Sequence, residues 1–359
     1  MSTSLRPDVS APGPRSLPTS LDGSGLTIVG GERLASLDAL EPLAERIFGV
    51  GERRRGWFGR KLVREGVDPH LCALLVPKSL VQDVHVGPRH PTGDLPPGPH
   101  KIGADPTPGP KIAPWDVEGY VLLGRSTSLG ASARGAGVGL LAARRGLGWG
   151  ASMIDFAAER ARTAGLETLE FLAEPERLNW YERLGFTVVR EELALLHHGT
   201  GGHCPRGDAR SLAVATSDPQ ATEIDARPEA DPRWDGYLWS WVPEHWRRTP
   251  PEERLLVEIP ATAELPAARA WLSSEGRAQL VHRLSFDGRG DPQFVAPTVA
   301  RLLSLFPAGV PVLLYPCPAL PCEWLLSLLD AGWSVSQRSF VVMKETPGTG
   351  PGVFSTIGR

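Results

Sequence analysis

A pair of arginines followed by a glycine-rich turn is the part of this 359-residue sequence best suited to chemistry. The turn reads Arg144-Arg145-Gly146-Leu147-Gly148-Trp149-Gly150, and Ala151 follows it. Glycine lets a backbone approach a ligand closely, and arginine brings a fixed charge and a fork of donors. If a helix begins here, its first turn adds unpaired N–H groups and the positive end of the helix dipole. Together these properties predict a site for an anion, above all a phosphate.

The residues around the turn predict the elements that would position it. An apolar run from Val138 to Ala143 predicts a strand before the turn. Apolar residues at helical spacing predict an amphipathic helix from about Ala151 to Ala164, which Gly165 would end. Alternating apolar and acidic residues from Leu166 to Leu172 predict a half-buried strand. The expected unit is therefore strand, glycine turn, helix and strand.

Two phosphate-binding interpretations fit the turn, beside a structural glycine turn that binds no ligand. Gly146-x-Gly148-x-x-Ala151 matches the dinucleotide-binding pattern, with Glu167 or Glu170 as the ribose partner. That pattern usually opens a doubly wound domain, whereas this turn lies well inside the chain with no βαβ repeats around it. The second pattern is Arg145-x-x-Gly148-x-Gly150, and it has a companion downstream.

The companion is the stretch Asn179-Trp180-Tyr181-Glu182-Arg183-Leu184-Gly185-Phe186. Together the two motifs, separated by one predicted helix and one predicted strand, resemble the GNAT superfamily of N-acetyltransferases. The resemblance covers about residues 26–198, where the expected order of strand, two helices, further strands and glycine loop is also that of a GNAT domain. It implies direct transfer of an acetyl group from acetyl-CoA to an amine acceptor while both substrates are bound.

The resemblance also implies roles for individual residues. The arginine–glycine loop would hold the pyrophosphate of acetyl-CoA, the co-substrate, and backbone N–H groups of the preceding strand would hold its carbonyl oxygen. Tyr181 would protonate the departing thiolate as the catalytic general acid. Asn179 would orient the pantetheine arm or Tyr181, or would serve as a helix N-cap. The cofactor-binding residues implied in this way are Leu140, Leu141, Ala142, Arg144, Arg145, Gly146, Leu147, Gly148, Trp149, Gly150, Ala151 and Asn179.

The general base departs from the pattern of this superfamily. Many members carry a glutamate on the strand before the glycine loop, but Gly139 to Ala143 contains no carboxylate. Glu118 or Asp116 acting through water would fill the gap, as would an amine that arrives uncharged. The missing base also leaves an alternative function open, that of an acyl-CoA-binding pseudoenzyme or sensor without transfer activity.

The second half of the chain ends in a pattern similar to the close of a GNAT domain. Glu323 to Ala331 predicts a helix, and Gly332-Trp333 leads into a strand from Ser339 to Lys344. An acidic segment, Asp287 to Pro292, stands where an arginine–glycine loop would be, and the tyrosine position is absent. We therefore expect an α/β (α+β) fold of two GNAT-like domains, each a mixed, mostly antiparallel sheet flanked by helices. The degenerate second copy would shape the acceptor cleft or a dimer interface.

Composition marks the expected boundaries of these domains. Residues 1–25 and 347–359 predict a disordered leader and tail, and 199–232 predicts a linker between domains at 26–198 and 233–346. Within the first domain, residues 79–115 form an insertion rich in proline and glycine. The loop from Ser126 to Gly139, which contains Gly135-x-Gly137-x-Gly139, is interpreted as a flexible connection.

The overall composition restricts the class of partner. Hydrophobic residues make up 41% and charged residues 22%, and the net charge of -3 provides no general attraction to nucleic acid or membrane. The sequence has neither a signal-peptide pattern nor an apolar run of about 20 residues. The four cysteines lack the paired spacing of a zinc site. We expect a cytoplasmic monomer or homodimer, without metal, that acts on a small-molecule or peptide amine.

Overall fold

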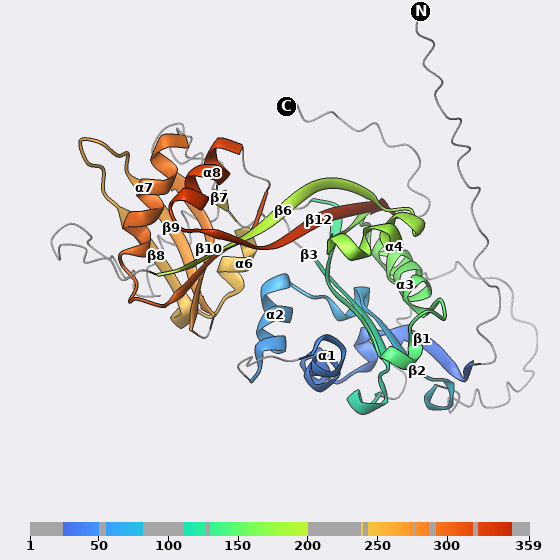
Figure 1. The fold of residues 1–359 in the computed structure, drawn as a ribbon. Coiled ribbons are helices and arrows are strands. Elements are labelled where there is room, and N and C mark those ends of the chain that lie inside the picture. The colour runs from blue at the N-terminus through green and yellow to red at the C-terminus, as the bar shows by residue number, and fades with distance from the viewer. Residues whose placement is uncertain are drawn as a thin grey trace, which may run out of the picture.

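One mixed β-sheet continues through both halves of the chain in the computed structural model (Figure 1). The structure describes residues 24–49, 55–81, 111–125, 130–199, 238–239, 243–275, 277–286, 292–318 and 322–346. Within these residues the strand order is β1-β2-β3-β4-β5-β12-β6-β11-β10-β9-β8, and β7 pairs with β10. Nearly all of the predicted leader, insertion, linker and tail lie outside the described residues, as does the acidic segment before Pro292.

The first half of the sheet is covered by helices on both faces. Its strands, antiparallel except for the parallel pair β4–β5, are β1 (Leu26–Gly30), β2 (Ala73–Pro77), β3 (Gly119–Arg125), β4 (Ser132–Leu140) and β5 (Thr168–Ala173). The helices are α1 (Glu41–Phe48) and α2 (Trp57–Glu65) on one face, and α3 (Trp149–Thr163) and α4 (Leu178–Arg183) on the other.

Alternation of side chains along β2 shows how the two faces are filled. Leu74 packs in the same cluster as Leu43 of α1 and Phe58 of α2, whereas Leu75 packs in the cluster of Met153 on α3. Successive strand residues point to opposite faces, so an uninterrupted apolar strand is what a sheet covered on both sides requires. All of these side chains are at most 5% exposed, which fixes the central strands of the first half between two apolar layers.

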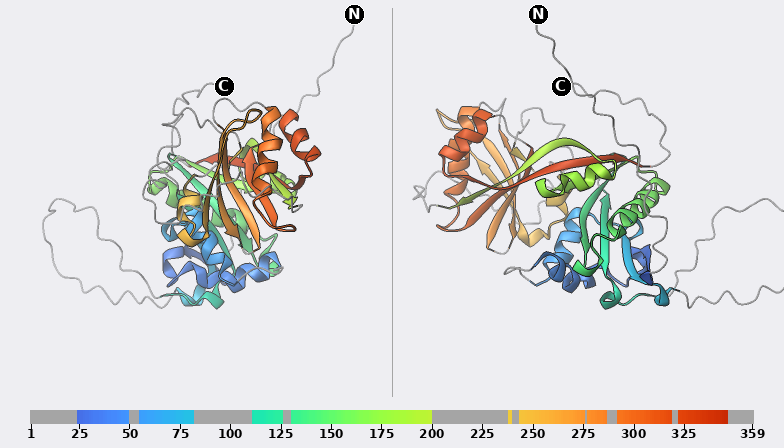
Figure 2. Two further views of the ribbon diagram at one scale, coloured as in Figure 1. Left: turned by 90° about the vertical axis from the view of Figure 1, so that its left-hand side faces the viewer. Right: turned by 45° about the vertical axis from the view of Figure 1, so that its right-hand side comes forward.

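The second half is a sheet with its own helices and core. Its elements are β7 (Leu238–Trp239), α6 (Pro243–Arg248), β8 (Arg254–Ile259), β9 (Ala268–Glu275), β10 (Ala278–Phe286), α7 (Pro292–Leu303), β11 (Pro311–Pro318) and α8 (Cys322–Asp330). Helices α7 and α8 lie together on one face of this sheet (Figure 2). Val299 of α7, Leu328 of α8 and Leu272 of β9 are fully buried in its core. No helix in the described part of the chain is both long and apolar enough to span a bilayer.

Two long strands belong to both halves of the sheet. They are β6 (Thr187–His198) and β12 (Ser334–Glu345), and they run side by side across the molecule (Figure 1). Residues 340–345 of β12 pair with β5 in the first half, while residues 311–318 of β11 pair with β6 in the second. The C-terminal strand therefore completes the sheet of the N-terminal half, and neither half buries its core without the other.

The contribution of β12 to the core of the first half can be tested by substitution. Val342 is fully buried in the cluster of Met153 and Phe171, whereas Val335 on the same strand is 44% exposed. We expect Val342→Ala to lower the free energy of unfolding by about 2 kcal/mol, because two buried methyl groups and their packing are lost. Val335→Ala, the matched control, should change it by less than about 0.5 kcal/mol. Urea denaturation of both variants measures the difference, and equal values would contradict the role of β12 in the first core.

Candidate functional site

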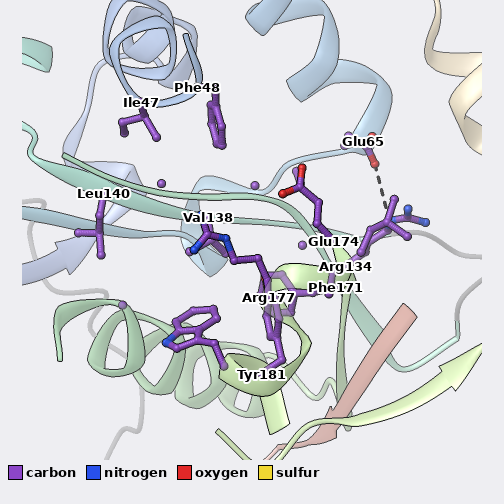
Figure 3. Close-up of a pocket in the computed structure, with 18 of the residues that line it drawn as sticks. Ile47, Phe48, Glu65, Arg134, Val138, Leu140, Phe171, Glu174, Arg177 and Tyr181 are labelled. Carbon is purple, nitrogen blue, oxygen red and sulfur yellow. Dashed lines mark ion pairs between the residues drawn. The ribbon is translucent and has the colours of Figure 1, made fainter. Parts of the chain in front are cut away.

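A cavity of about 860 Å³ opens where β4 and β5 separate (Figure 3). The two strands pair only from Ser132 to Arg134 of β4, opposite Thr168 to Glu170 of β5, although both continue beyond these residues. Residues 135–140 of β4 and 171–173 of β5 then line opposite sides of the cavity. Beyond Arg134 the backbone of β4 on this side has no strand partner among the described residues, so it presents hydrogen-bonding groups to the cavity.

The glycine-rich segment before the turn is a strand, and the prediction of a flexible connection there is wrong. Ala136 forms a β-bulge, because Leu122 of β3 pairs with Gly137 and Leu123 pairs with Gly135. Glycine weakens strand propensity, which explains the wrong prediction. Tertiary packing overrides that low propensity, because only a residue without a side chain fits against the neighbouring element. A Cβ on Gly135 would overlap the ring of Phe171. At Gly139 a Cβ would lie 3.0 Å from Ile47 and from Tyr120.

The arginine–glycine turn lies at one end of the cavity. Helix α3 begins at Trp149, close to the predicted start, and Gly148 is its N-cap with φ of 86°. Gly146 has φ of 76°, and a Cβ built on either glycine would meet no atom within 4 Å. Both glycines therefore hold left-handed backbone beside open space at a helix N-terminus. Arg145 contacts the carbonyl oxygens of Leu140 at 3.1 Å and Ile47 at 3.5 Å, and it also lines the cavity.

The structure divides the predicted site residues into two groups. Those that line the cavity are Leu140, Arg145, Gly146, Gly148, Gly150, Ala151 and Tyr181. Those that do not are Leu141, Ala142, Arg144, Leu147, Trp149 and Asn179. The N–H of Leu141 already donates to the carbonyl oxygen of Glu118, and Ala142 lies in the 3-10 turn Ala142–Arg144. The side chain of Leu147 is half exposed, whereas Trp149 is buried in the core of the first half.

The carboxylates proposed from sequence lie elsewhere. Arg144 forms an ion pair with Glu118, and neither Glu118 nor Asp116 lines the cavity. Glu170 accepts a hydrogen bond from Ser132 Oγ at 3.2 Å, and neither it nor Glu167 lines the cavity. The ribose partner that a dinucleotide would need is therefore not beside the turn.

Tyr181 lies on α4 and lines the cavity (Figure 3). Its ring packs against Phe171, Phe186 and Trp180, with centroids 5.6, 5.4 and 4.8 Å away. Burial raises the pKa of the Tyr181 phenol, an effect that Arg177 opposes and Glu174 reinforces. At neutral pH the side chain therefore holds its proton and can donate it to a group that develops negative charge.

The other end of the cavity contains a buried charged cluster that the sequence did not indicate. Glu65, the last residue of α2, places Oε2 3.0 Å from Nε2 of His245 on α6 and 3.9 Å from Nε of Arg134 on β4. The side chains of Glu65, His245 and Arg134 are 14%, 5% and 9% exposed. No sequence signal could have paired Glu65 with His245, because they come from opposite halves of the chain and only the fold brings α6 onto α2.

Charge states within this cluster follow from burial and neighbours. Burial by itself would raise the pKa of the Glu65 carboxyl, but His245, Arg134 and Lys61 outweigh burial and hold that pKa well below its usual range. Burial lowers the pKa of His245, and the charges of Arg134 and Arg64 add to the lowering against the opposing effect of Glu65. At neutral pH the pair is therefore a carboxylate beside an uncharged imidazole.

Buried imidazoles predict a loss of stability in mild acid. Burial lowers the pKa of His282 as well as that of His245, and His282 Nε2 lies 2.7 Å from Ser273 Oγ. Below about pH 6.5 the unfolded chain binds protons that the folded protein does not. The free energy of unfolding should therefore fall from pH 7.5 to 5.5, by at most about 1.4 kcal/mol per pH unit for each histidine. Chemical denaturation across this range measures it. His282→Gln should flatten the slope, and an unchanged slope in this variant would contradict the prediction.

Several solved structures are similar to this chain in fold. A Pyrococcus horikoshii protein described as an acetyltransferase has a TM-score of 0.53 and 9% identity, covering 92% of this chain and 93% of that chain. A GCN5-related N-acetyltransferase from Sphaerobacter thermophilus has a TM-score of 0.51 and 14% identity, covering 92% and 97%. The glucosamine N-acetyltransferase region of a fungal multi-domain β-N-acetylglucosaminidase has a TM-score of 0.56 and 9% identity, covering 89% and 38%.

These likenesses establish the fold. The chain has the α/β fold of the GCN5-related N-acetyltransferases, and the expectation of a GNAT-like fold is confirmed. The likeness to the first two structures extends over nearly the whole of both chains, second half included. The sequence matches no protein-family model and no curated protein sequence.

Proposed function

We propose that this chain, with the fold of the GCN5-related N-acetyltransferases, moves an acetyl group from acetyl-CoA to an amine by direct transfer. One observation supports the proposal most strongly. A single cavity joins the glycine turn at the N-terminus of α3 to the buried phenol of Tyr181, and continues to the cluster of Glu65 and His245. A diphosphate carrier, a proton donor and an acceptor would thereby meet in one space.

Residues at the turn fit a diphosphate. Gly146 and Gly148 keep the space beside the first turn of α3 free of side chains, and the N–H groups of that turn have no intrahelical acceptors. Arg145 adds a guanidinium at the same end of the cavity. Gly150 permits close packing, because a Cβ there would lie 3.1 Å from Trp180. Acetyl-CoA would supply a thioester whose acyl group a nitrogen nucleophile can take.

Residues along β4 and α4 fit the transfer step. The bulge at Ala136 and the unpaired side of β4 offer backbone donors to a carbonyl oxygen that gains charge. Tyr181 holds its proton in the buried phenol and would give it to the departing sulfur. Asn179 does not line the cavity, so an orienting role for it would be indirect.

The proposal is tested in two steps. Isothermal calorimetry with coenzyme A should register binding, and thiol release from acetyl-CoA should increase when primary amines are added. Binding without thiol release on any of a broad panel of amines would favour the alternative, an acyl-CoA sensor. A protein that neither binds coenzyme A at millimolar concentration nor releases thiol would overturn the proposal.

A further inference from the structure

We propose that Glu65 and His245 form the site for the acceptor amine, so that the C-terminal half of the chain supplies part of the active site. This inference rests on the proposed acetyl transfer and adds to it the group that receives the amine's proton. It also specifies the acceptor as a primary or secondary amine, whose proton the pair would take.

Strand β4 orders the two ends of the cavity. Its end at Leu140 contacts Arg145 of the turn, and its start at Arg134 faces Glu65. At about 3.3 Å per residue, the stretch between Arg134 and Leu140 spans about 20 Å. An extended thiol arm that starts at the turn would therefore run along β4 toward Glu65.

Tyr181 marks where that arm would end. Gly135, next to Arg134, fits only because it has no side chain against the Phe171 ring, and Phe171 in turn packs on Tyr181. The proposed proton donor therefore lies at the Arg134 end of β4. Glu65 lines the cavity just beyond this point, on the side away from Leu140 (Figure 3), and Nε2 of His245, which also lines the cavity, lies 3.0 Å from its Oε2. An acceptor approaching from there meets the pair before it meets the thioester.

His245 is held against Glu65 by contacts along its own helix. Trp246 donates its indole N–H to the carbonyl oxygen of Leu272 at 2.8 Å, which seats α6 on β9. Arg248 donates to the carbonyl oxygens of Arg64 at 3.4 Å and Arg125 at 2.9 Å. A cation at the C-terminal end of α2 stabilises that end of the helix, and here it also ties α6 to the residue preceding Glu65. The position of His245 against Glu65 is therefore fixed by contacts of α6 with α2 and β9.

The residues around the Glu65–His245 pair give its two members different charge states. The charged and titratable residues around it are Lys61 and Arg64 on α2, Arg134 on β4 and His282 on β10. Arg134 and Lys61 favour the ionised form of Glu65, while burial together with Arg134 and Arg64 favours the uncharged form of His245. A carboxylate can accept a hydrogen bond from an amine N–H, and an uncharged imidazole can accept a proton.

The transfer then balances as follows. The protonated amine gives one proton to the pair, which releases it to solvent, and becomes an uncharged amine. The amine nitrogen forms a bond to the thioester carbonyl carbon, and the carbon–sulfur bond breaks. The sulfur takes a proton from Tyr181, and the nitrogen loses a second proton, which restores the phenol. One ammonium and one thioester yield one amide, one thiol and one released proton.

Glu65→Gln and His245→Asn test the proposal, with Glu252→Gln and His198→Asn at exposed positions as matched controls. Three quantities are compared with those of the native chain: coenzyme A affinity by calorimetry, thiol release with n-butylamine, spermidine and glycinamide, and thiol release to water alone. We expect affinity within about twofold for all variants. For both active-site variants we expect amine-dependent release at least about 100-fold slower, the scale of lost acid–base catalysis. The acid limb of the kcat/KM profile should be present in the native chain and absent in His245→Asn.

The outcomes separate this inference from the proposed function. If the native chain does not bind coenzyme A, the function itself fails. If the native chain acetylates an amine and both variants do so at the native rate and with the native pH profile, the acceptor site is elsewhere while the function stands. If coenzyme A binds but the native chain releases thiol neither to amines nor to water, the inference is also overturned, because a working proton acceptor beside the thioester should activate water.

Discussion

Tyr181→Phe is expected to slow thiol release from acetyl-CoA at least about 100-fold, because the departing sulfur would lose its proton donor. The phenol is suited to that role by its place in the cavity and by burial, which raises its pKa and keeps it protonated at neutral pH. Its ring would be preserved in the variant, so the packing against Phe171, Trp180 and Phe186 should remain. Coenzyme A affinity should therefore change by less than about threefold.

Tyr120 provides a matched control for this substitution. It is fully buried on β3, burial raises its pKa as well, and its hydroxyl has no hydrogen-bond partner among the described residues. Tyr120→Phe removes the same atom from a similar environment but does not border the cavity, so transfer should continue at the native rate. Steady-state rates with a fixed amine measure both variants. A Tyr181→Phe protein that works as fast as Tyr120→Phe would remove the phenol from the mechanism.

Gly148→Val is expected to weaken coenzyme A binding by about 100-fold or more. Gly148 has φ of 86°, a backbone conformation that β-branched residues essentially avoid, so the N-cap of α3 would have to change shape. The new side chain would also occupy the open space at the helix N-terminus, where a diphosphate would accept backbone N–H donors. A 100-fold loss corresponds to about 2.7 kcal/mol, the scale of one or two charge-assisted hydrogen bonds.

Substitution of Gly165 is the control that separates the effect of backbone strain from the effect on ligand binding. It follows the other end of α3 with φ of 77°, and a Cβ there would also meet open space. Gly165→Val should therefore lower stability by a similar amount, about 1–2 kcal/mol, without affecting coenzyme A. Calorimetry with coenzyme A and urea denaturation on both variants measure the two effects. Equal affinities in Gly148→Val and Gly165→Val would place the diphosphate away from the turn.

Local sequence was sufficient to predict structure where all the residues that determine an element lie within one stretch of the chain. Apolar spacing predicted the helix after the turn to within two residues of its start, and Gly165 marked its end. Gly146 and Gly148 predicted the special backbone of the turn, because only glycine adopts φ near 80° without strain. The same stretch named Arg145, Gly150 and Tyr181, and all three line the cavity. Arg144 and Trp149 lie in the same stretch and were also named, and only the fold shows them in an ion pair and in the core.

Tertiary structure decided what depends on partners far along the chain. Gly135 and Gly139 read as a loop because glycine lacks strand propensity, and they become β4 because Phe171, Ile47 and Tyr120 leave no room for side chains. Val342 stabilises a core whose other members precede it by at least 150 residues, because β12 returns to pair with β5. Glu65 and His245 meet only through the packing of α6 on α2, and the charge each carries is set by burial there. The sequence alone thus determined the glycine turn and the tyrosine of the proposed transfer site, whereas folding the two halves into one sheet brought together the Glu65–His245 pair proposed to receive the acceptor.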